Sequence, residues 1–195
     1  MKRLLITGFN PFGGEMINPA WEAVSRLPEI IGEYSVHPIM IPTEFGKALE
    51  RILEEKEKIQ PDVIISVGQA GGRKSVTPEM VAINLIYAGI PDNAGNAPKD
   101  VPVCNDGPDA YFTTIPVRKM SDAIVNAGLS SAVSYSAGTF VCNEVMYSVL
   151  HHCKGTHVRA GFIHVPFLPE QAKDGQPSMP LQDICRALEA AISAL

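Results

Sequence analysis

The sequence has no long apolar run, no cluster of lysine and arginine, and few cysteines. No window approaches the roughly 20 consecutive apolar residues that a membrane-spanning helix requires. The apolar stretch Leu4 to Ile6 is interrupted by Gly8 and Pro11, so we expect no secretion signal. The formal net charge is −5, and no run of lysine and arginine is present. The charge pattern therefore gives no reason to expect nucleic acid or an anionic membrane as a partner. These absences predict a soluble, cytoplasmic protein with a small or neutral ligand.

Cysteine is scarce and lacks CxxC spacing, because the chain contains only Cys104, Cys142, Cys153 and Cys185. A reducing compartment argues against a disulfide framework, so any cysteine that matters is expected to act as a thiol. His151, His152 and Cys153 are adjacent, but neighbouring helical residues point to different faces and no second ligand pair completes a site. We therefore expect no metal and no cofactor.

The glycine-rich segment Gly8 to Gly14 lacks both the G-x-G-x-x-G pattern and the lysine of a P-loop. A phosphate cradle is therefore a poor interpretation. The segment presents Phe9 and Phe12, which together with Phe140 would suit a flat neutral ligand, although aromatic residues are more often part of a core.

Periodicity predicts alternating strands and helices in a single domain, residues 1–195, since 195 residues with 46% hydrophobic content can form one core. The expected strands are 2–7, 34–41, 62–67, 81–88, 131–135 and 160–165, and the expected helices begin at Asn18 and cover 44–59, 118–127, 143–152 and 181–195. Parallel neighbours need long, commonly helical, crossovers, so we predict a three-layer α/β/α sandwich with a mostly parallel twisted central sheet.

Ligands of such open sheets bind outside the carboxyl ends of the strands. The segments there are 9–14, 69–73, 136–142 and 164–169. The segment 90–109 has a loop composition and is too long for a simple connection, which is typical of functional loops. Its length makes closure over a substrate worth testing.

Cys142 follows a predicted strand and immediately precedes a predicted helix. The unpaired amides and the positive dipole end of a helix start would lower the pKa of its thiol and offer donors to an oxyanion. The alternative is a buried cysteine packed as a small hydrophobic residue.

His164 and Glu79 are polar residues at the ends of apolar segments. The predicted strand that contains His164 is otherwise apolar, so the imidazole needs a polar partner. His164 is either a core histidine bonded to a backbone carbonyl or a base for a thiol. Glu79 is either an exposed charge or the carboxylate that orients this imidazole, as in a Cys-His-acid triad.

Several segments together resemble pyroglutamyl peptidase type I, also called pyrrolidone-carboxylate peptidase, in the same order and over nearly the whole chain. They are Thr7 to Gly14, Asn18-Pro19 with Trp21-Glu22, Val67 to Arg73, Val81 to Asn84, Ile90 to Asn93, Ala137 to Asn143 and Gly161 to His164.

The resemblance implies a metal-free α/β/α cysteine exopeptidase, usually a homotetramer, which removes N-terminal pyroglutamate from peptides through a thioester. Its triad corresponds to Cys142 as nucleophile, His164 as base and Glu79 as the residue that orients the histidine. The residues implied to form or position the pyroglutamyl pocket are Phe9, Phe12, Asn18, Gln69, Ile90, Phe140 and Val141.

The chain departs from the family pattern at three positions. Met80 and Gly89 stand where arginine is common, and Glu144 stands where histidine is common. An arginine at position 89 would lie close to the active site, so Gly89 removes a source of positive charge there. Two other interpretations use the same residues: an α/β hydrolase or phosphorylase-like enzyme for another small cyclic or nucleoside substrate, and a non-catalytic binding protein.

Overall fold

A computed structural model describes all residues from 1 to 195. Its centre is a six-stranded sheet with the order β2-β3-β1-β4-β10-β5. The strands are β1 (Lys2–Phe9), β2 (Ile30–Ile31), β3 (Tyr34–Ile41), β4 (Val63–Gln69), β5 (Thr77–Pro78) and β10 (Arg159–Val165). The four long strands β3, β1, β4 and β10 are parallel, and the two short edge strands pair antiparallel.

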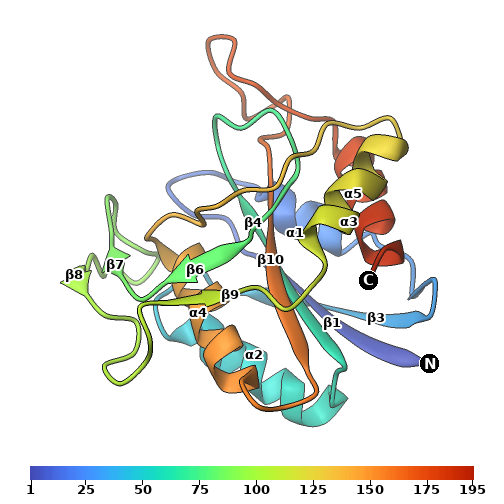
Figure 1. Cartoon of the computed structure of the whole chain (residues 1–195). Helices are drawn as coiled ribbons and strands as arrows, with labels where there is room; N and C mark the ends of the chain where they lie inside the picture. The colour runs from blue at the N-terminus through green and yellow to red at the C-terminus, as the bar shows by residue number, and fades with distance from the viewer.

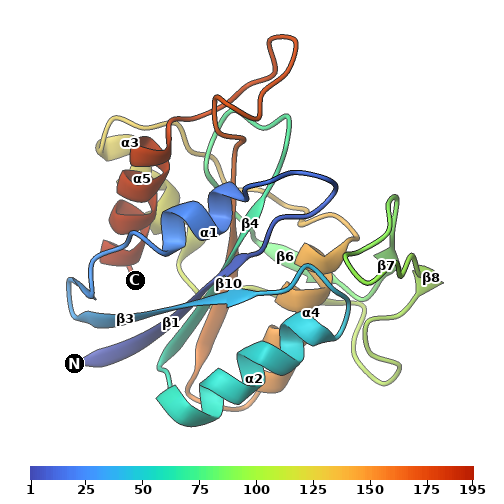
Figure 2. The same ribbon diagram turned by 180° about the vertical axis from the view of Figure 1, so that it is seen from behind.

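Five helices cover the two faces of this sheet. They are α1 (Pro19–Val24), α2 (Lys47–Ile59), α3 (Val117–Asn126), α4 (Val141–Cys153) and α5 (Leu181–Ser193). Helices α1, α3 and α5 lie on one face and α2 and α4 on the other (Figure 1, Figure 2). Each face has its own hydrophobic cluster, so the predicted α/β/α sandwich with a mostly parallel sheet is confirmed.

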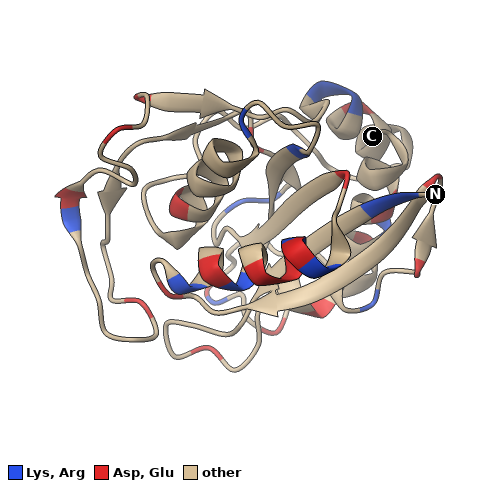
Figure 3. Ribbon diagram, turned by 90° about the horizontal axis from the view of Figure 1, so that it is seen from below, with Lys and Arg blue, Asp and Glu red and all other residues tan.

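Helices α2 and α4 differ in how much of their surface is solvated. Acidic and basic residues alternate along α2 (Figure 3), where Arg51 lies 2.7 Å from Glu55, while Ala48 and Ile52 are fully buried. Most of α4 is buried, because α2, the sheet and the short strands β6 and β9 all pack against it. Cys142 therefore stands on a helix that is held from several sides. None of the helices is long and apolar enough to cross a membrane.

Two predicted strands are wrong in detail. The segment 81–88 forms β6 (Val81–Ile83) and β7 (Ile86–Tyr87), which pair outside the main sheet with β9 (Ala110–Phe112) and β8 (Lys99–Val101). Between them the Asn84 side chain bonds both the N–H and the carbonyl of Cys104, which takes the place of ladder pairing.

The segment 131–135 forms no strand. It makes only isolated bridges, Val76 with Ser131 and Glu79 with Ser134, because the neighbouring β5 is only two residues long. The segment still matters for the site. The Met80 amide donates to the Ser134 carbonyl at 2.7 Å and the Ser134 amide donates to the Pro78 carbonyl at 2.9 Å, so the chain is held on both sides of Glu79.

Candidate active site

Cys142 is the second residue of α4. The helix starts without a side-chain cap, and the amides of residues 141–143 have no acceptor within the protein. The Asn143 side chain instead pins the helix start to the segment after β6, by accepting from the Ile83 amide and donating to the carbonyls of Ile83 and Leu85. The sulfur thus stands at a helix start with free N–H groups, on a rigid support.

His164 and Glu79 form a direct buried contact. Nδ1 of His164 lies 2.7 Å from Oε1 of Glu79, and the two side chains are 4% and 0% exposed. The same Oε1 also accepts from Nη1 of Arg73 at 2.6 Å, while Oε2 has no hydrogen-bond partner. Because a carboxylate is an obligate acceptor, this contact places a proton on Nδ1 and leaves Nε2 as the lone-pair nitrogen.

Gly68 links the sulfur to the imidazole. It pairs with His164 across β4 and β10, so both residues face the same side of the sheet. A Cβ atom at Gly68 would lie 2.9 Å from the Cys142 sulfur and 2.8 Å from the ring of Phe162, whose centroid is 4.8 Å from that of His164. The absence of a side chain at Gly68 therefore makes room for the thiol next to the histidine.

Burial controls the protonation states of this pair. It raises the pKa of the Cys142 thiol to about 12, an effect that the Glu79 charge reinforces and the Arg73 charge opposes. Burial also lowers the pKa of His164, against the hydrogen bond and charge of Glu79. The sequence-based expectation of a lowered thiol pKa is thus wrong for the free protein, since desolvation is the largest influence on the half-buried Cys142 and acts in the opposite direction. The resting pair is a neutral thiol and a neutral imidazole.

The apolar residues predicted for the pocket divide into two groups. Phe12 and Phe140 are half-buried, with ring centroids 6.1 Å apart, and Ile90 is 47% exposed with its tip close to Gly13. Phe9 and Val141, at 2% and 0% exposure, lie in the core. Phe12, Phe140 and Ile90 thus offer an open apolar surface. Phe9 and Val141 support this surface from the core.

The two predicted polar residues hold loops. Asn18 is buried; its Oδ1 accepts from the Ala20 amide as the cap of α1, and its Nδ2 donates to the Asn10 carbonyl. Gln69 accepts at Oε1 from Nε2 of Gln171. Since Oε1 of Gln171 accepts from the Leu168 amide, its Nε2 must face Gln69, which leaves the Gln69 amide N–H₂ free to donate.

The start of the long loop is clamped onto the 10–14 loop. Nδ2 of Asn93 donates to the Pro11 carbonyl at 2.9 Å. The buried Asp92 carboxylate accepts from the amides of Phe45, Ala94 and Asn96. Phe45 also stacks edge-on against Phe140, with centroids 5.3 Å apart. These contacts place Ile90 beside the aromatic pair.

Sequence reasoning missed the roles of Arg73, Asn143, Gln171 and Phe45. The signal for Arg73 was available in principle, because a buried carboxylate needs a cation or several donors and Arg73 follows a strand end, six residues before Glu79. Asn143 and Gln171 act through backbone groups of distant segments, and no spacing in the chain indicates those partners.

The three departures from the family pattern have different surroundings. Gly89 is exposed, and a Cβ atom there would meet nothing within 4 Å. Met80 packs against the cluster under α3 and α5. Glu144 is buried, which raises the pKa of its carboxyl to about 7, and only Oε1 has a partner, the Ser148 hydroxyl.

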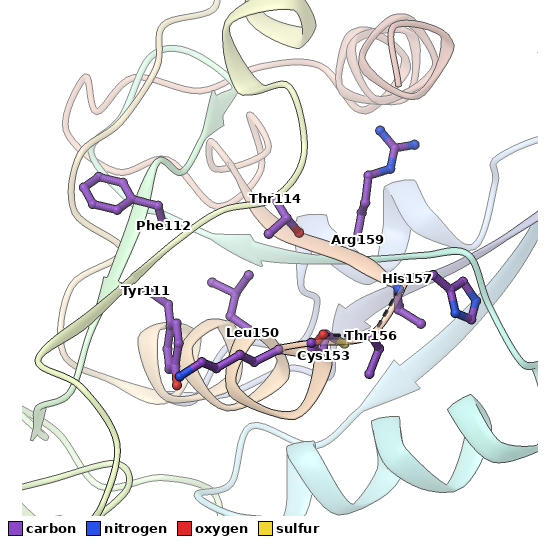
Figure 4. Close-up of a pocket in the computed structure, with 11 residues that line it drawn as sticks. Tyr111, Phe112, Thr114, Leu150, Cys153, Thr156, His157 and Arg159 are labelled. Carbon is purple, nitrogen blue, oxygen red and sulfur yellow. Dashed lines mark hydrogen bonds between the residues drawn. The ribbon is translucent and has the colours of Figure 1, made fainter.

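A separate cavity of about 280 Å³ lies at the amino end of β10 (Figure 4). It contains Cys153 and His157, but its lining has no carboxylate, and the His157 ring points away from Cys153. Cys153 is eleven residues along α4 from Cys142, which corresponds to roughly 16 Å of helix. No group of three or more His, Cys, Asp or Glu residues has the arrangement of a metal site. Cys104 also lies near an imidazole and a carboxylate, 3.9 Å from Nε2 of His151 and 3.0 Å from Asp106, but there the carboxylate contacts the sulfur, and Nδ1 of His151 contacts the Tyr111 hydroxyl. The Cys142 site is therefore the one in which a carboxylate holds the imidazole and the thiol stands at a helix start.

The sequence matches the family model described as pyroglutamyl peptidase over residues 2–195. The chain belongs to the pyroglutamyl peptidase family. It is thus a member of a family of cysteine exopeptidases, which are hydrolases.

Curated relatives and solved structures agree with this membership. The chain is 52% identical to the pyrrolidone-carboxylate peptidase of Clostridium perfringens, with 99% of this chain and 92% of that protein covered. It is 54% identical to the enzyme of the same name from Levilactobacillus brevis, with 99% and 97% covered. Pyroglutamyl peptidase I of Bacillus amyloliquefaciens superposes with a TM-score of 0.96 at 46% identity, covering 100% of this chain and 96% of that one.

Proposed function

We propose that this peptidase hydrolyses the bond after an N-terminal pyroglutamyl residue, with Cys142, His164 and Glu79 as a catalytic triad. The observation that carries the proposal is the 2.7 Å contact between Nδ1 of His164 and Oε1 of Glu79, buried beside the sulfur on the first turn of α4. Membership of the pyroglutamyl peptidase family supports the substrate class.

The first step is proton transfer with nucleophilic attack. Nε2 of His164 takes the thiol proton as the sulfur forms a bond to the carbonyl carbon that follows the pyroglutamyl ring. Glu79 stabilises the imidazolium that results. The carbonyl π electrons move to the oxygen, and the free amides of residues 141–143 are placed to donate to that oxyanion. A thiol with a pKa of about 12 is not ionised before the substrate arrives, so the proton transfer to His164 must accompany the attack by the sulfur.

The second step releases the peptide. The oxyanion collapses, the C–N bond breaks, and the leaving amine takes the proton from Nε2 of His164. The pyroglutamyl group then remains on Cys142 as a thioester. Water, deprotonated by His164, attacks this thioester, the C–S bond breaks, and the thiol regains its proton as free pyroglutamate leaves.

The pocket residues suit a lactam. Pyroglutamate has a flat ring and no free α-amine, so it offers apolar faces and amide groups but no charge. Phe12, Phe140 and Ile90 supply an apolar surface, supported by Phe9 and Val141. The free amide N–H₂ of Gln69 supplies a donor for a carbonyl, and Asn18 holds the loop that carries Phe12.

Hydrolysis of arylamide reporters tests the proposed function. The purified protein in reducing buffer is expected to cleave a pyroglutamyl-arylamide and to leave the matching prolyl and glutamyl reporters intact. The prolyl reporter lacks the ring carbonyl and the glutamyl reporter carries charges that the pocket does not match. Equal cleavage of all three would overturn the proposed specificity.

Filling the space at Gly68 is expected to impair the reaction while the fold persists. In Gly68→Ala the new methyl group must displace the Cys142 sulfur or the Phe162 ring, and a small misplacement of a reacting atom costs about 100-fold in rate. Overpacking is expected to cost about 1–3 kcal/mol of stability. The kcat on the pyroglutamyl reporter and the thermal unfolding midpoint measure both effects. Gly89→Ala is the control, since a Cβ atom there has open space, and unchanged kcat in Gly68→Ala would contradict the prediction.

A further inference from the structure

Arg73 is the one cation in contact with the buried Glu79 carboxylate. It lies in the loop between β4 and β5, with 31% of its side chain exposed, whereas Glu79 is fully buried. The guanidinium therefore stands between the carboxylate and the solvent. Nη1 of Arg73 contacts Oε1 of Glu79, which is the same oxygen that contacts Nδ1 of His164.

The same guanidinium connects three segments of the active site. Nη1 donates to the Thr77 hydroxyl and to Glu79, each at 2.6 Å, and Nη2 donates to the Ser136 carbonyl at 3.0 Å. Thr77 begins the edge strand β5, and Ser136 lies six residues before Cys142, in the loop that leads into α4. A planar fork with donors in fixed directions can hold these groups together, which a single ammonium group does less well.

We propose that Arg73 is a positioning residue of the triad, which directs Glu79 at His164 and supplies the positive charge opposite the Cys142–His164 pair. The proposal rests on the proposed catalytic function and adds the residue that sets the pH range of the site. Arg73 touches neither the nucleophile nor the imidazole in the structure, so it acts through Glu79 and through its charge.

The charged groups near Cys142 and His164 show how Arg73 affects the pKa values of these two residues. The charged groups that act on Cys142 and His164 are Glu79, which follows β5, and Arg73, from the loop after β4. Glu79 raises the pKa of both groups and Arg73 lowers both. Removal of Arg73 therefore raises both pKa values. Because the reactive form needs a neutral His164 and a Cys142 that still carries its proton, both limbs of the pH profile move to higher pH.

The test compares Arg73→Met with Arg73→Lys and with the control Lys74→Met. Lys74 is exposed, forms no hydrogen bond or ion pair, and carries the same charge one residue away. The first readout is the rate at which chloroacetamide alkylates Cys142 between pH 5 and 10, followed by mass spectrometry of the peptide that contains this residue. The second readout is the pH dependence of kcat/KM on the pyroglutamyl reporter.

For Arg73→Met, the rise of the alkylation rate with pH is expected to move up by about one pH unit, because chloroacetamide reacts with the thiolate, and the acid limb of kcat/KM is expected to move in the same direction. Arg73→Lys keeps the positive charge, so its profile is expected to lie close to that of the unchanged protein. Lys74→Met is expected to leave the profile unchanged. A residue that only stabilised the fold would lower the rate without moving the limbs. An unshifted profile in Arg73→Met, or an equal shift in Lys74→Met, would overturn the proposal.

A substitute variant and a readout that is independent of the pocket make the outcome of the Arg73 experiment interpretable in every case. If Arg73→Met does not fold, Arg73→Gln takes its place, because the amide can still donate to Glu79 but carries no charge; its profile is expected to shift by the same amount. Alkylation does not use the pyroglutamyl pocket. A wrong substrate assignment would abolish the reporter signal and leave the alkylation shift, whereas a wrong role for Arg73 would remove the shift and leave reporter cleavage intact.

Discussion

Cys142→Ala is expected to reduce hydrolysis of a pyroglutamyl reporter by at least about 10⁴-fold, since removal of a catalytic nucleophile eliminates the covalent route. The free amides of residues 141–143 and the apolar surface of Phe12 and Phe140 remain, so substrate binding is expected to persist without attack on the carbonyl. The change removes one sulfur atom next to Gly68, and the free energy of unfolding is expected to change by no more than about 1 kcal/mol. Initial rates and thermal unfolding measure the two quantities separately.

The other cysteines supply matched controls. Cys104 lies 3.0 Å from the Asp106 carboxylate, which raises the pKa of its thiol, and Cys185 packs against α1, where its sulfur contacts the Ala23 carbonyl. Cys104 also lies 3.9 Å from Nε2 of His151, but this imidazole contacts the Tyr111 hydroxyl and no carboxylate, and neither cysteine stands at the start of a helix. Cys104→Ala and Cys185→Ala are therefore expected to keep their activity. An active Cys142→Ala protein, or an inactive Cys104→Ala protein that is folded, would refute the assigned nucleophile.

Glu79→Gln is expected to lower kcat/KM by about 10⁴-fold, the loss typical when the acid of a triad becomes an amide. A glutamine can leave its carbonyl oxygen where Oε1 now accepts from both His164 and Arg73, and its N–H₂ can occupy the site of the unpartnered Oε2. The geometry can therefore persist while the charge disappears. The imidazolium formed during attack then has no counter-ion, and Arg73 becomes a cation without its carboxylate.

The pH profile distinguishes this loss of charge from a loss of structure. Glu79 raises the pKa of both His164 and Cys142, so its removal lowers both, and the activity profile is expected to move to lower pH. This direction is opposite to that expected for Arg73→Met. Glu144→Gln is the matched control, because it replaces a second buried carboxyl group, two residues from Cys142 on α4, that does not contact the triad. A profile for Glu79→Gln that keeps its position, or one that moves upward, would contradict the assigned role.

The central sheet and its helices were predictable because their signals are local. The apolar runs that became β1, β4 and β10 are buried on both faces, as expected for parallel strands between helices. Segment 81–88 and segment 131–135 misled the prediction for a physical reason. Their apolar residues pack against α4 and the sheet edge, but their backbone groups pair outside the main sheet, in the short ladders of β6 with β9 and β7 with β8 and in isolated bridges.

The candidate site was predictable only in part. Cys142, His164 and Glu79 each stand where a strand ends or a helix begins, which indicated them before any contact was known. Arg73 was not singled out, since its partners Thr77, Glu79 and Ser136 come from segments that meet only in the folded chain. The pKa of the Cys142 thiol was predicted in the wrong direction, because burial depends on everything that surrounds a group.

The sequence by itself determined the layered α/β architecture, the absence of a basic surface, and the three residues that carry the proposed chemistry. Strand and helix periodicity, turn residues and charge are properties of short segments, and they survive without coordinates. Only the tertiary structure decided that one oxygen of Glu79 serves both His164 and Arg73, that Gly68 leaves room for the Cys142 sulfur, and that the thiol rests neutral. Proximity and desolvation arise when distant segments pack together, and both set the pKa values on which the reaction depends.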